Sequence, residues 1–294
     1  MGLIENKIAL CARKTSLELE RYFAEKDEDS CPVFDAMQYS VASGGKRIRP
    51  FLVHAFSECF GGRRDEASVY ACALEMIHTY SLIHDDLPCM DDDDLRRGNP
   101  TCHKVYGEAT ALLAGDALLT YAFEIVADSS VISDKNKVRA VSILSRCSGR
   151  YGMIGGQQID LLGEIKPMTY ELMAKMHTLK TGALINAACL LGCLSADIYD
   201  DNILNNVSCY AEGIGRVFQL VDDILDITST DEELGKPTHS DEKNMKTTYM
   251  SFMTVEMAAE LAHIMTEKAC LAVEEYDRNG ILKALAEYLR DRKK

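Results

Sequence analysis

Two long tracts of the chain contain no proline, and they restrict its fold more than any other feature. The six prolines stand at positions 32, 50, 88, 100, 167 and 237, so residues 101–166 and 168–236 are uninterrupted. Apolar residues recur in both tracts with the period of an α-helix, and no clear strand alternation is visible. No linker rich in Gly, Ser or Pro divides the sequence. We therefore expect one all-α domain over residues 1–294.

The helical pattern is strong enough to place the elements approximately. The expected helices cover residues 3–25, 34–42, 50–60, 65–85, 105–128, 134–163, 169–195, 200–226, 248–277 and 279–292. Residues 228–247 form the one long polar loop, and a loop of this length is usually functional or disordered. It contains Lys236 and Lys246, so we interpret it as a lid that supplies cations once a substrate is bound.

Composition excludes several classes of function. Apolar residues make up 47% of the chain, enough for a sizeable core, and the net charge of −14 argues against nucleic acid or an anionic membrane as a partner. The longest apolar run, Ala183–Leu194, is shorter than the roughly 20 residues that a membrane span needs. Eleven scattered cysteines with no C-x-x-C pair indicate free thiols in a reducing compartment. We expect a soluble, cytoplasmic protein with no stable membrane association.

A run of acidic residues directly follows an apolar helical segment, Ala73–His84. Its carboxylates are Asp85, Asp86 and Asp91 to Asp94, with Arg96 and Arg97 behind them. Such crowded like charges raise one another's pKa and destabilise the site unless a cation is present. Carboxylates without His or Cys favour Mg²⁺ over Zn²⁺, and the arginines suggest a phosphate that shares the metal. An exposed acidic turn is the alternative, but a solvated loop seldom follows a core helix directly.

The spacing within this run predicts a local geometry. On a regular helix, Asp85 and Asp91 would lie about 240° apart. They can face one metal only if the helix bends or ends between them, and Pro88 lies between them to do so. We expect Asp85 to close a helix and Asp91 to return from a loop.

A second acidic motif lies in Phe218–Asp226. Asp222 and Asp226 are four residues apart, so their carboxylates lie on one helical face about 40° apart. They repel each other unless a cation lies above them. Two opposed Asp clusters around several Mg²⁺ ions would form a clamp for a diphosphate, because each metal bridges carboxylate and phosphate oxygens.

With both acidic sites in view, the chain resembles the trans-isoprenyl diphosphate synthases of the polyprenyl synthetase family, and most of all the bacterial farnesyl diphosphate synthases. The resemblance spans nearly the whole chain. Its motifs, in order, are Gly44–Pro50, Asp85–Asp91 with Arg96–Gly98, Gly155–Asp160, Lys180–Gly182, Gln219–Asp226, and Leu234–Pro237 followed by Lys246–Tyr249. It implies an all-α, single-domain, multi-helix bundle of the isoprenoid synthase type with a central substrate cavity, and a homodimer.

The resemblance also implies roles for individual residues. The direct Mg²⁺ ligands would be Asp85, Asp91 and Asp222, supported by Asp86, Asp223 and Asp226. The allylic diphosphate would be held by Arg96, Lys180, Lys236 and Lys246. Isopentenyl diphosphate would be held by Lys46, Arg49, His78 and Arg97. The charges agree, since two diphosphates bring about −6 that must be paired. Gly44 and Gly45 before Lys46, and a helix start after Pro50, independently favour phosphate there.

The implied reaction is a short-chain prenyl transfer. About three Mg²⁺ ions and the basic residues would stabilise the departing pyrophosphate, so that the allylic substrate ionises. Isopentenyl diphosphate attacks the carbocation, and the released pyrophosphate is the expected base. Among the catalytic residues Lys180, Thr181 and Gln219, the Lys180 carbonyl and the other two side chains would face the cation. Dimethylallyl and then geranyl diphosphate would be extended, mainly to farnesyl diphosphate.

Product length is predicted from the helix before the first acidic motif. Tyr80 and Ser81 precede Asp85 by about one helical turn, a rise of about 6–7 Å. The growing tail would run beside this helix, so a bulky Tyr80 would form the floor of the cavity. The resemblance associates an aromatic residue there with a C15 product. Ordinary core packing of Tyr80 is the alternative.

Other functions stay open at this point. A geranylgeranyl diphosphate synthase would make C20 instead, and release of geranyl diphosphate is not fixed. A class I terpene cyclase would not need Lys46, Arg49 and Arg97, and a non-catalytic partner subunit would usually have lost one acidic motif. An EF-hand module is disfavoured because no loop of that pattern is present. Gln157 and Asp160 match a motif but receive no role. The basic tail Arg290–Lys294 either closes over the site or is solvated, and we expect it to be solvated.

Overall fold

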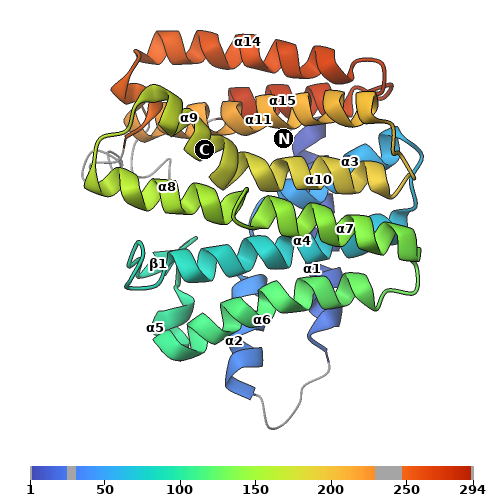
Figure 1. The fold of residues 1–294 in the computed structure, drawn as a ribbon, viewed down its shortest axis with the longest axis vertical. Helices are drawn as coiled ribbons and strands as arrows, with labels where there is room; N and C mark the ends of the chain where they lie inside the picture. Colours follow the sequence, from blue (N-terminus) through green and yellow to red (C-terminus); the bar gives the residue numbers. More distant parts are fainter. Residues whose placement is uncertain (1, 25–30, 229–246, 293–294) are drawn as a thin grey trace. The chain divides into compact units, whose positions relative to one another are not determined.

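Helices make up almost all of the regular structure in the computed structural model (Figure 1), so the all-α prediction is confirmed. The structure describes residues 2–24, 31–228 and 247–292. The chain divides into two compact units. Unit 1 consists of Met1–Ser142 and Leu194–Asp197, and unit 2 of Ile143–Cys193 and Ile198–Lys294. Each unit is described by itself, and the single domain over residues 1–294 stays a prediction.

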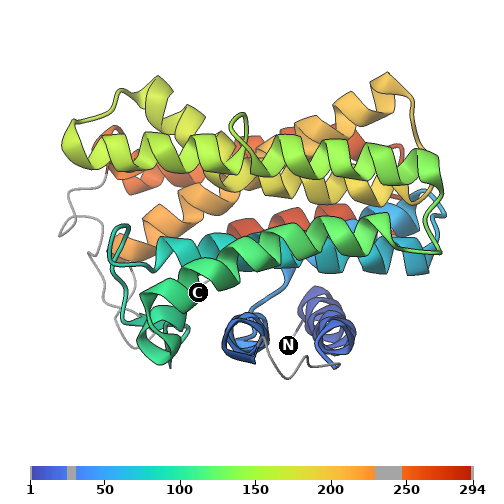
Figure 2. The ribbon, with the colours of Figure 1, turned by 60° about the horizontal axis from the view of Figure 1, so that its bottom comes forward.

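Unit 1 is built around one central helix, α4, which is the apolar segment that precedes the first acidic run. Its elements are α1 (Leu3–Tyr22), α2 (Cys31–Ala42), α3 (Ile48–Cys59), α4 (Arg64–Asp85), β1 (Leu95–Arg96), β2 (Asn99–Pro100), α5 (Cys102–Tyr106), α6 (Glu108–Ala127) and the start of α7 (Asp134–Ser148). α4 packs against α3 and α6 and is buried along most of its length. Figure 1 shows α4 and α6 side by side, and Figure 2 shows α1 and α2 end-on beneath α6. This packing fixes the end of α4, where the acidic run begins.

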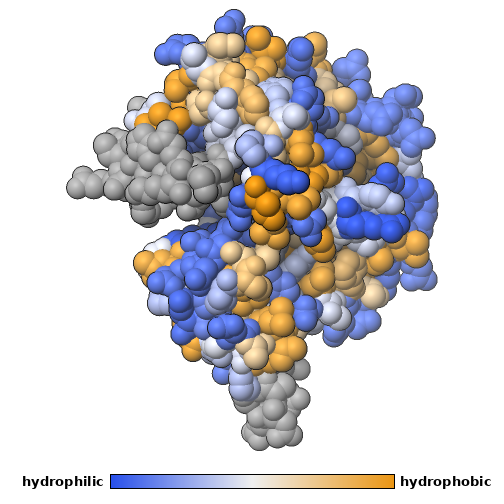
Figure 3. Space-filling view, turned by 60° about the vertical axis from the view of Figure 1, so that its left-hand side comes forward, coloured by the Kyte–Doolittle hydropathy of each residue, from blue (hydrophilic) through white to orange (hydrophobic). Residues whose placement is uncertain are grey.

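Helix α6 is apolar over a greater length than the unbroken apolar runs of the sequence indicated. In the described part of the chain it is the one helix long and apolar enough to cross a membrane by length and composition. The sequence argument missed it because Asp116 and Glu124 interrupt its apolar residues. α6 packs against α4, α2 and α5 within unit 1. On the face drawn in Figure 3, hydrophobic residues are interspersed with hydrophilic ones.

Unit 2 is organised around α11, the helix that carries the second acidic motif. Its elements are the end of α7, α8 (Met153–Ile165), α9 (Tyr170–His177), the π-helical η1 (Thr178–Gly182), α10 (Ala183–Leu194), α11 (Asp201–Thr228), η2 (Tyr249–Ser251), α14 (Val255–Val273) and α15 (Ile281–Asp291). α11 begins where the Asp200 carboxylate accepts hydrogen bonds from the first backbone amides. It packs most extensively against α14 and also contacts α15, η1 and η2. A core of Val217, Leu220, Val221 and their neighbours anchors it.

Four predicted helices are subdivided, and one element was missed. The helix expected at 248–277 is divided into η2 and α14. The helix expected at 105–128 is broken at Gly107, and the one expected at 134–163 is broken between Ser148 and Met153. The helix expected at 169–195 contains the π-helical turn η1. The short hairpin β1–β2 was not predicted, because two-residue strands are too short to show an alternating pattern. The cysteines whose side chains the structure describes are free thiols, as expected.

Candidate active site

The first acidic motif has the local geometry that its spacing predicted. α4 ends at Asp85, and the backbone N–H of Asp91 donates to the Asp85 carbonyl over 2.9 Å. A turn that contains Pro88 therefore returns the chain to the helix end within six residues. The two carboxylates originate from adjacent stretches of backbone, and an all-oxygen donor pair suits Mg²⁺. Their role as ligands stays a prediction.

Arg96 lies against this motif through a buried carboxylate. Its Nε donates to Asp86 Oδ1 over 2.6 Å, Nη2 contacts the same oxygen, and Asp93 lies 3.6 Å away. Burial lowers the pKa of Arg96, but the hydrogen bond to Asp86 and the negative charges of Asp86, Asp85 and Asp93 together hold the pKa above its usual value. Asp86 therefore fixes the Arg96 guanidinium beside the acidic motif and neutralises part of the charge of the guanidinium.

The hairpin β1–β2 joins this motif to a loop far away in sequence. Arg97 and Gly98 both have positive φ, the combination that a two-residue type I′ hairpin turn requires. The Arg97 guanidinium donates to the Gly44 carbonyl. A Cβ on Gly45 would lie 2.6 Å from Arg97 Nη1, so only glycine allows this approach. The structure thus brings together two motifs that lie about 50 residues apart in the sequence.

Arg49, His78 and Arg97 are predicted to bind isopentenyl diphosphate, and they lie close enough for the charged residues among them to shift the pKa of their neighbours. Burial lowers the pKa of Arg49, and Arg97 lowers it further against an opposing effect of Glu75. Burial and the nearby arginines, Arg49 first, hold the pKa of His78 well below its ordinary value, so this imidazole is neutral near pH 7. We call Arg47, Arg49, His78 and Arg97 the basic cluster. The three arginines of this cluster concentrate positive charge, which favours an anion.

Arg47 belongs to the basic cluster but was not among the predicted site residues. Its side chain is buried, with Nη1 donating to Glu75 Oε1 over 2.6 Å and Nη2 to the Val41 carbonyl over 2.5 Å. The negative charge of Glu75 therefore compensates the positive charge of Arg47. Within the described residues, Arg49 Nε is buried without a hydrogen-bond partner, which leaves a donor for a ligand. The predicted residue Lys46 is exposed.

The predicted chain-length residues lie one turn before Asp85 on α4. Tyr80 is buried, and its hydroxyl has no hydrogen-bond partner among the described residues. Its ring packs edge-on against His84 with centroids 5.7 Å apart, and burial raises the pKa of Tyr80 to about 12. Ser81 donates to the His78 carbonyl over 2.8 Å. Tyr80 is therefore a fixed, bulky side chain near the acidic motif.

In unit 2, η1 brings Lys180 and Thr181 to α8 and α11. Lys180 Nζ forms an ion pair with Asp160 Oδ2 at 2.6 Å, which gives Asp160 the role that the sequence left open. Thr181 Oγ1 donates to Gln219 Oε1 over 3.4 Å. π-Helical turns are rare and often mark functional sites, and this one contains the whole Lys180–Gly182 motif.

A hydrogen-bonded network extends from Gln219 to the segment after residue 246. Gln219 Nε2 donates to Asp223 Oδ1 over 3.3 Å, and the backbone N–H of Tyr249 donates to Asp223 Oδ2 over 2.8 Å. The Tyr249 ring stacks on His177, with centroids 5.3 Å apart and 15° between the planes. Burial lowers the pKa of His177 to about 4. No role was predicted for His177 or for Tyr249, although Tyr249 closes one of the motifs. Asp223 accepts a hydrogen bond from Gln219 on one side and from Tyr249 on the other.

Asp222 lies on α11 beside this network, and its side chain is 39% exposed. Its Oδ1 accepts a hydrogen bond from Arg292 over 2.6 Å. The expectation of a solvated C-terminal tail is therefore wrong for Arg292, whose side chain is 5% exposed. Lys236 and Lys246, predicted to bind the allylic diphosphate, lie outside the described residues.

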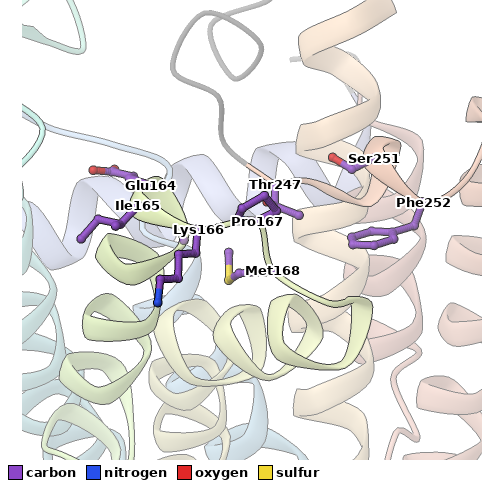
Figure 4. A pocket seen from close by; sticks show the side chains of 9 residues that line it. Glu164, Ile165, Lys166, Pro167, Met168, Thr247, Ser251 and Phe252 are labelled. Carbon is purple, nitrogen blue, oxygen red and sulfur yellow. The ribbon is translucent and has the colours of Figure 1, made fainter.

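Two cavities can be compared with the predicted residues, and one of them includes a predicted residue, Arg96, in its wall. Figure 4 shows one of about 520 Å³ in unit 2, where the end of α8 and the following loop face η2. It is lined by Gly163, Glu164, Ile165, Lys166, Pro167, Met168, Thr247, Ser251 and Phe252. A much smaller one of about 30 Å³ lies in unit 1 and includes Asp86 and Arg96 in its wall. Over residues 2–24, 31–228 and 247–292, no group of three or more His, Cys, Asp or Glu side chains is arranged to hold a metal.

Comparison with known proteins decides the family. The sequence model described as polyprenyl synthetase matches residues 32–287. The chain belongs to the polyprenyl synthetase family. This polyprenyl synthetase is 42% identical over 294 residues to a farnesyl diphosphate synthase of Escherichia coli (strain K12), with 98% of each chain covered. It is 45% identical over 263 residues to a geranylgeranyl diphosphate synthase of Cyanophora paradoxa, with 88% of this chain and 87% of that one covered.

Solved structures support the same fold. An apo FPP/GFPP synthase from Zymomonas mobilis superposes with a TM-score of 0.85 at 33% identity, covering 96% of this polyprenyl synthetase and 98% of that chain. A geranyltransferase from Helicobacter pylori, complexed with magnesium and isoprenyl diphosphate, superposes with a TM-score of 0.83 at 31% identity. It covers 98% of this chain and 97% of that one. The all-α isoprenoid synthase fold is thereby established.

Proposed function

We propose that this polyprenyl synthetase is a transferase that condenses isopentenyl diphosphate with an allylic diphosphate and releases pyrophosphate. The allylic substrates are dimethylallyl and then geranyl diphosphate, and the main product is farnesyl diphosphate. The observation that carries the proposal is the return of Asp91 to the end of α4 beside Asp85. An acidic pair placed in this way, in a chain so similar to a farnesyl diphosphate synthase along its whole length, fits a site for a metal-bound diphosphate.

Three carboxylates are the proposed metal ligands. Asp85, Asp91 and Asp222 would hold about three Mg²⁺ ions, as oxygen ligands suit this ion. When bound, the ions supply the charge stabilisation that lets the diphosphate leave. The geranyltransferase from Helicobacter pylori was solved with magnesium. The number of three ions is our proposal. Asp86 and Asp223 would support the site indirectly. Asp86 accepts a hydrogen bond from Arg96, and Asp223 accepts one from the Tyr249 amide.

The remaining residues would bind and orient the substrates. Arg96, Lys180, Lys236 and Lys246 would bind the allylic diphosphate, with Lys180 oriented by Asp160. Lys46, Arg49, His78 and Arg97 would bind isopentenyl diphosphate, where neutral His78 acts as a hydrogen-bond donor and the arginines supply charge. Thr181 and Gln219 would turn partial negative charge toward the allylic carbocation. The proton lost at the end of the reaction would pass to pyrophosphate.

A geranylgeranyl diphosphate synthase is the second candidate. The similarity to such a synthase from Cyanophora paradoxa, at 45% identity, favours it specifically. Buried Tyr80, one turn before Asp85, favours the shorter product because it would block elongation beyond C15. In either case we propose that the enzyme works as a cytoplasmic homodimer.

One incubation tests these proposals. Purified protein is supplied with Mg²⁺, dimethylallyl diphosphate and labelled isopentenyl diphosphate, and the dephosphorylated alcohols are resolved by length. We expect mainly farnesol, and no product after addition of EDTA. Predominant geranylgeraniol would support the second candidate. Absence of any prenyl alcohol, with correctly folded protein, would contradict both.

A further inference from the structure

The C-terminal end of α15 delivers an arginine to the second acidic motif. α15 packs on α11 and α14 within unit 2 and ends at Asp291, so that the next residue, Arg292, reaches α11. Arg292 Nη2 donates to Asp222 Oδ1 and to the Phe218 carbonyl, both over 2.6 Å. Its guanidinium also lies over the Phe218 ring, 4.0 Å from the ring centre.

The position of this guanidinium conflicts with that of a metal on the same oxygen. Mg²⁺ lies about 2.0–2.1 Å from a carboxylate oxygen that it binds. A cation at that distance from Oδ1 would compete with Arg292 for the same lone pairs and would repel its charge. Either Arg292 leaves when the metal binds, or the metal uses the other oxygen of Asp222.

The contacts of Arg292 favour departure over a permanent position. Within the described residues, its Nε is buried without a hydrogen-bond partner, so the guanidinium is only partly satisfied where it lies. Asp222 is more exposed than Arg292, which leaves the carboxylate open to an approaching ion. A doubly charged ion compensates the neighbouring carboxylates of α11 better than one guanidinium does.

We propose that Arg292 is a built-in counterion that occupies the metal position at Asp222 until Mg²⁺ and diphosphate displace it. It keeps the acidic motif folded while the metal is absent, and it makes the metal compete for its ligand. By linkage, metal binding at Asp222 must then weaken the attachment of Arg292 to α11 by the same factor. This inference rests on the proposed function, because it takes Asp222 as a ligand of the metal.

Metal affinity provides the first test, since a merely structural arginine would not lower it. Mn²⁺ is titrated in the presence of inorganic pyrophosphate and measured by electron paramagnetic resonance. Arg292→Gln is expected to bind Mn²⁺ roughly three- to tenfold more tightly than wild type, because a partly buried ion pair no longer competes. Arg292→Lys, which keeps the charge, is expected to remain near wild type.

A matched control separates local competition from overall charge. Arg290→Gln removes the same charge two residues earlier, but Arg290 pairs with Asp291 and contacts His263, not Asp222. It is expected to leave Mn²⁺ affinity within about twofold of wild type. If Arg290→Gln and Arg292→Gln tighten binding equally, the effect is general charge and the proposal is wrong. Unchanged or weaker binding in Arg292→Gln also overturns it and indicates a metal on the other oxygen.

A fluorescence reporter follows Arg292 itself. The chain contains no tryptophan, so Phe218→Trp introduces a single emitter directly beneath the guanidinium. Mn²⁺ quenches fluorescence itself, so diamagnetic Mg²⁺ with pyrophosphate is used here. We expect a saturable change of emission that is lost when Arg292→Gln is added. An equal change in the double variant would show that Arg292 does not move.

Asp222→Asn distinguishes failure of this inference from failure of the proposed function. If that variant binds Mn²⁺ as tightly as wild type, Asp222 is not a ligand and the proposed metal site is at fault. If Asp222→Asn weakens binding but Arg292→Gln does not strengthen it, the metal site stands and only the counterion proposal fails. Thermal unfolding of each variant without metal verifies that all of them are folded.

Discussion

The two acidic motifs of this polyprenyl synthetase contain similar residues, but one lies at a helix end and the following turn and the other lies within a helix. In unit 1, Asp85 closes a helix and Asp91 comes from a turn that Pro88 starts, so backbone geometry brings the two residues together. In unit 2, Asp222 and Asp226 lie within the regular helix α11. There, Arg292 from the end of α15 holds the Asp222 carboxylate, and the Tyr249 amide of η2 holds the neighbouring Asp223. The first motif is organised by its own sequence and the second by its surroundings.

This difference predicts how each motif tolerates substitution. Asp91 is positioned by its own backbone, whose N–H donates to the Asp85 carbonyl, so replacement of its side chain should affect chemistry more than stability. In unit 2, Asp223 accepts hydrogen bonds from Gln219 and from the Tyr249 amide, so the same replacement there would also leave buried donors unpaired. The predictions below use this contrast.

The largest effect is expected from Asp91→Asn. Loss of one ligand charge should reduce kcat/KM for farnesyl diphosphate formation about a thousandfold, equivalent to about 4 kcal/mol, with little change in the free energy of unfolding. Asp94→Asn is the matched control, because Asp94 is in the same run but is exposed and paired with Lys104. Its activity should stay within a few-fold of wild type. Equal losses in both variants would mean that the run acts through its total charge.

The next effect is a pH dependence of stability that arises in unit 2. Burial lowers the pKa of His177 to about 4 from an ordinary 6.5, so the unfolded chain takes up a proton first as pH falls. Neutral His177 contributes fully to stability above about pH 6.5, and this contribution is lost progressively down to about pH 4. The free energy of unfolding should fall by about 3 kcal/mol at most over this range. Urea unfolding at several pH values measures this slope.

His177→Gln identifies the source of that slope. The variant should be less stable near neutral pH, because the stack on Tyr249 is lost. It should also lose less free energy of unfolding than wild type between pH 6.5 and 4. An unchanged slope in the variant would assign the pH dependence to other groups.

The same contrast explains how much could be predicted from the sequence. The helical class, the end of α4 and the return of Asp91 follow from periodicity and from one proline, which act over a few residues. Lys46 and Arg47 are neighbours of the same type, yet only Arg47 is turned inward. That choice depends on Glu75, which is 28 residues away along the chain. No local pattern contains this information.

Unit 2 was predicted less completely for the same reason. The acidic residues and the Lys180–Gly182 motif were visible, but their partners Asp160, Tyr249 and Arg292 come from three other elements. Asp160 could have been found, because it is a carboxylate inside a motif next to a lysine motif. The burial of Arg292 had no such signal, since a basic C-terminal end is usually solvated.

Asp160→Asn tests whether those distant partners matter for activity. The change keeps the shape of the side chain but removes the charge that pairs with Lys180 Nζ. Without that orientation we expect kcat to fall about 10- to 100-fold, equivalent to about 1.4–2.7 kcal/mol, a size typical of residues that orient a ligand. Glu164→Gln, a similar loss of charge further along α8, is the control and should stay near wild type. If kcat is unchanged, Lys180 needs no orientation by Asp160.

The smallest effect on rate, and the most specific, is expected from Tyr80→Ala. Tyr80 has no hydrogen-bond partner for its hydroxyl among the described residues, so its substitution removes bulk and one edge-on contact with His84. Total turnover should fall only a few-fold, while the products should shift from C15 to C20 and longer. Tyr80→Phe, which keeps the bulk, should still make C15, and chromatography of the alcohols measures both. Because Tyr80 is buried, the cavity left by alanine should cost about 3 kcal/mol of stability, so both variants are compared well below their melting temperatures. A C15 product from folded Tyr80→Ala would show that this helix does not set the length, and the floor would then have to come from residues outside the first motif.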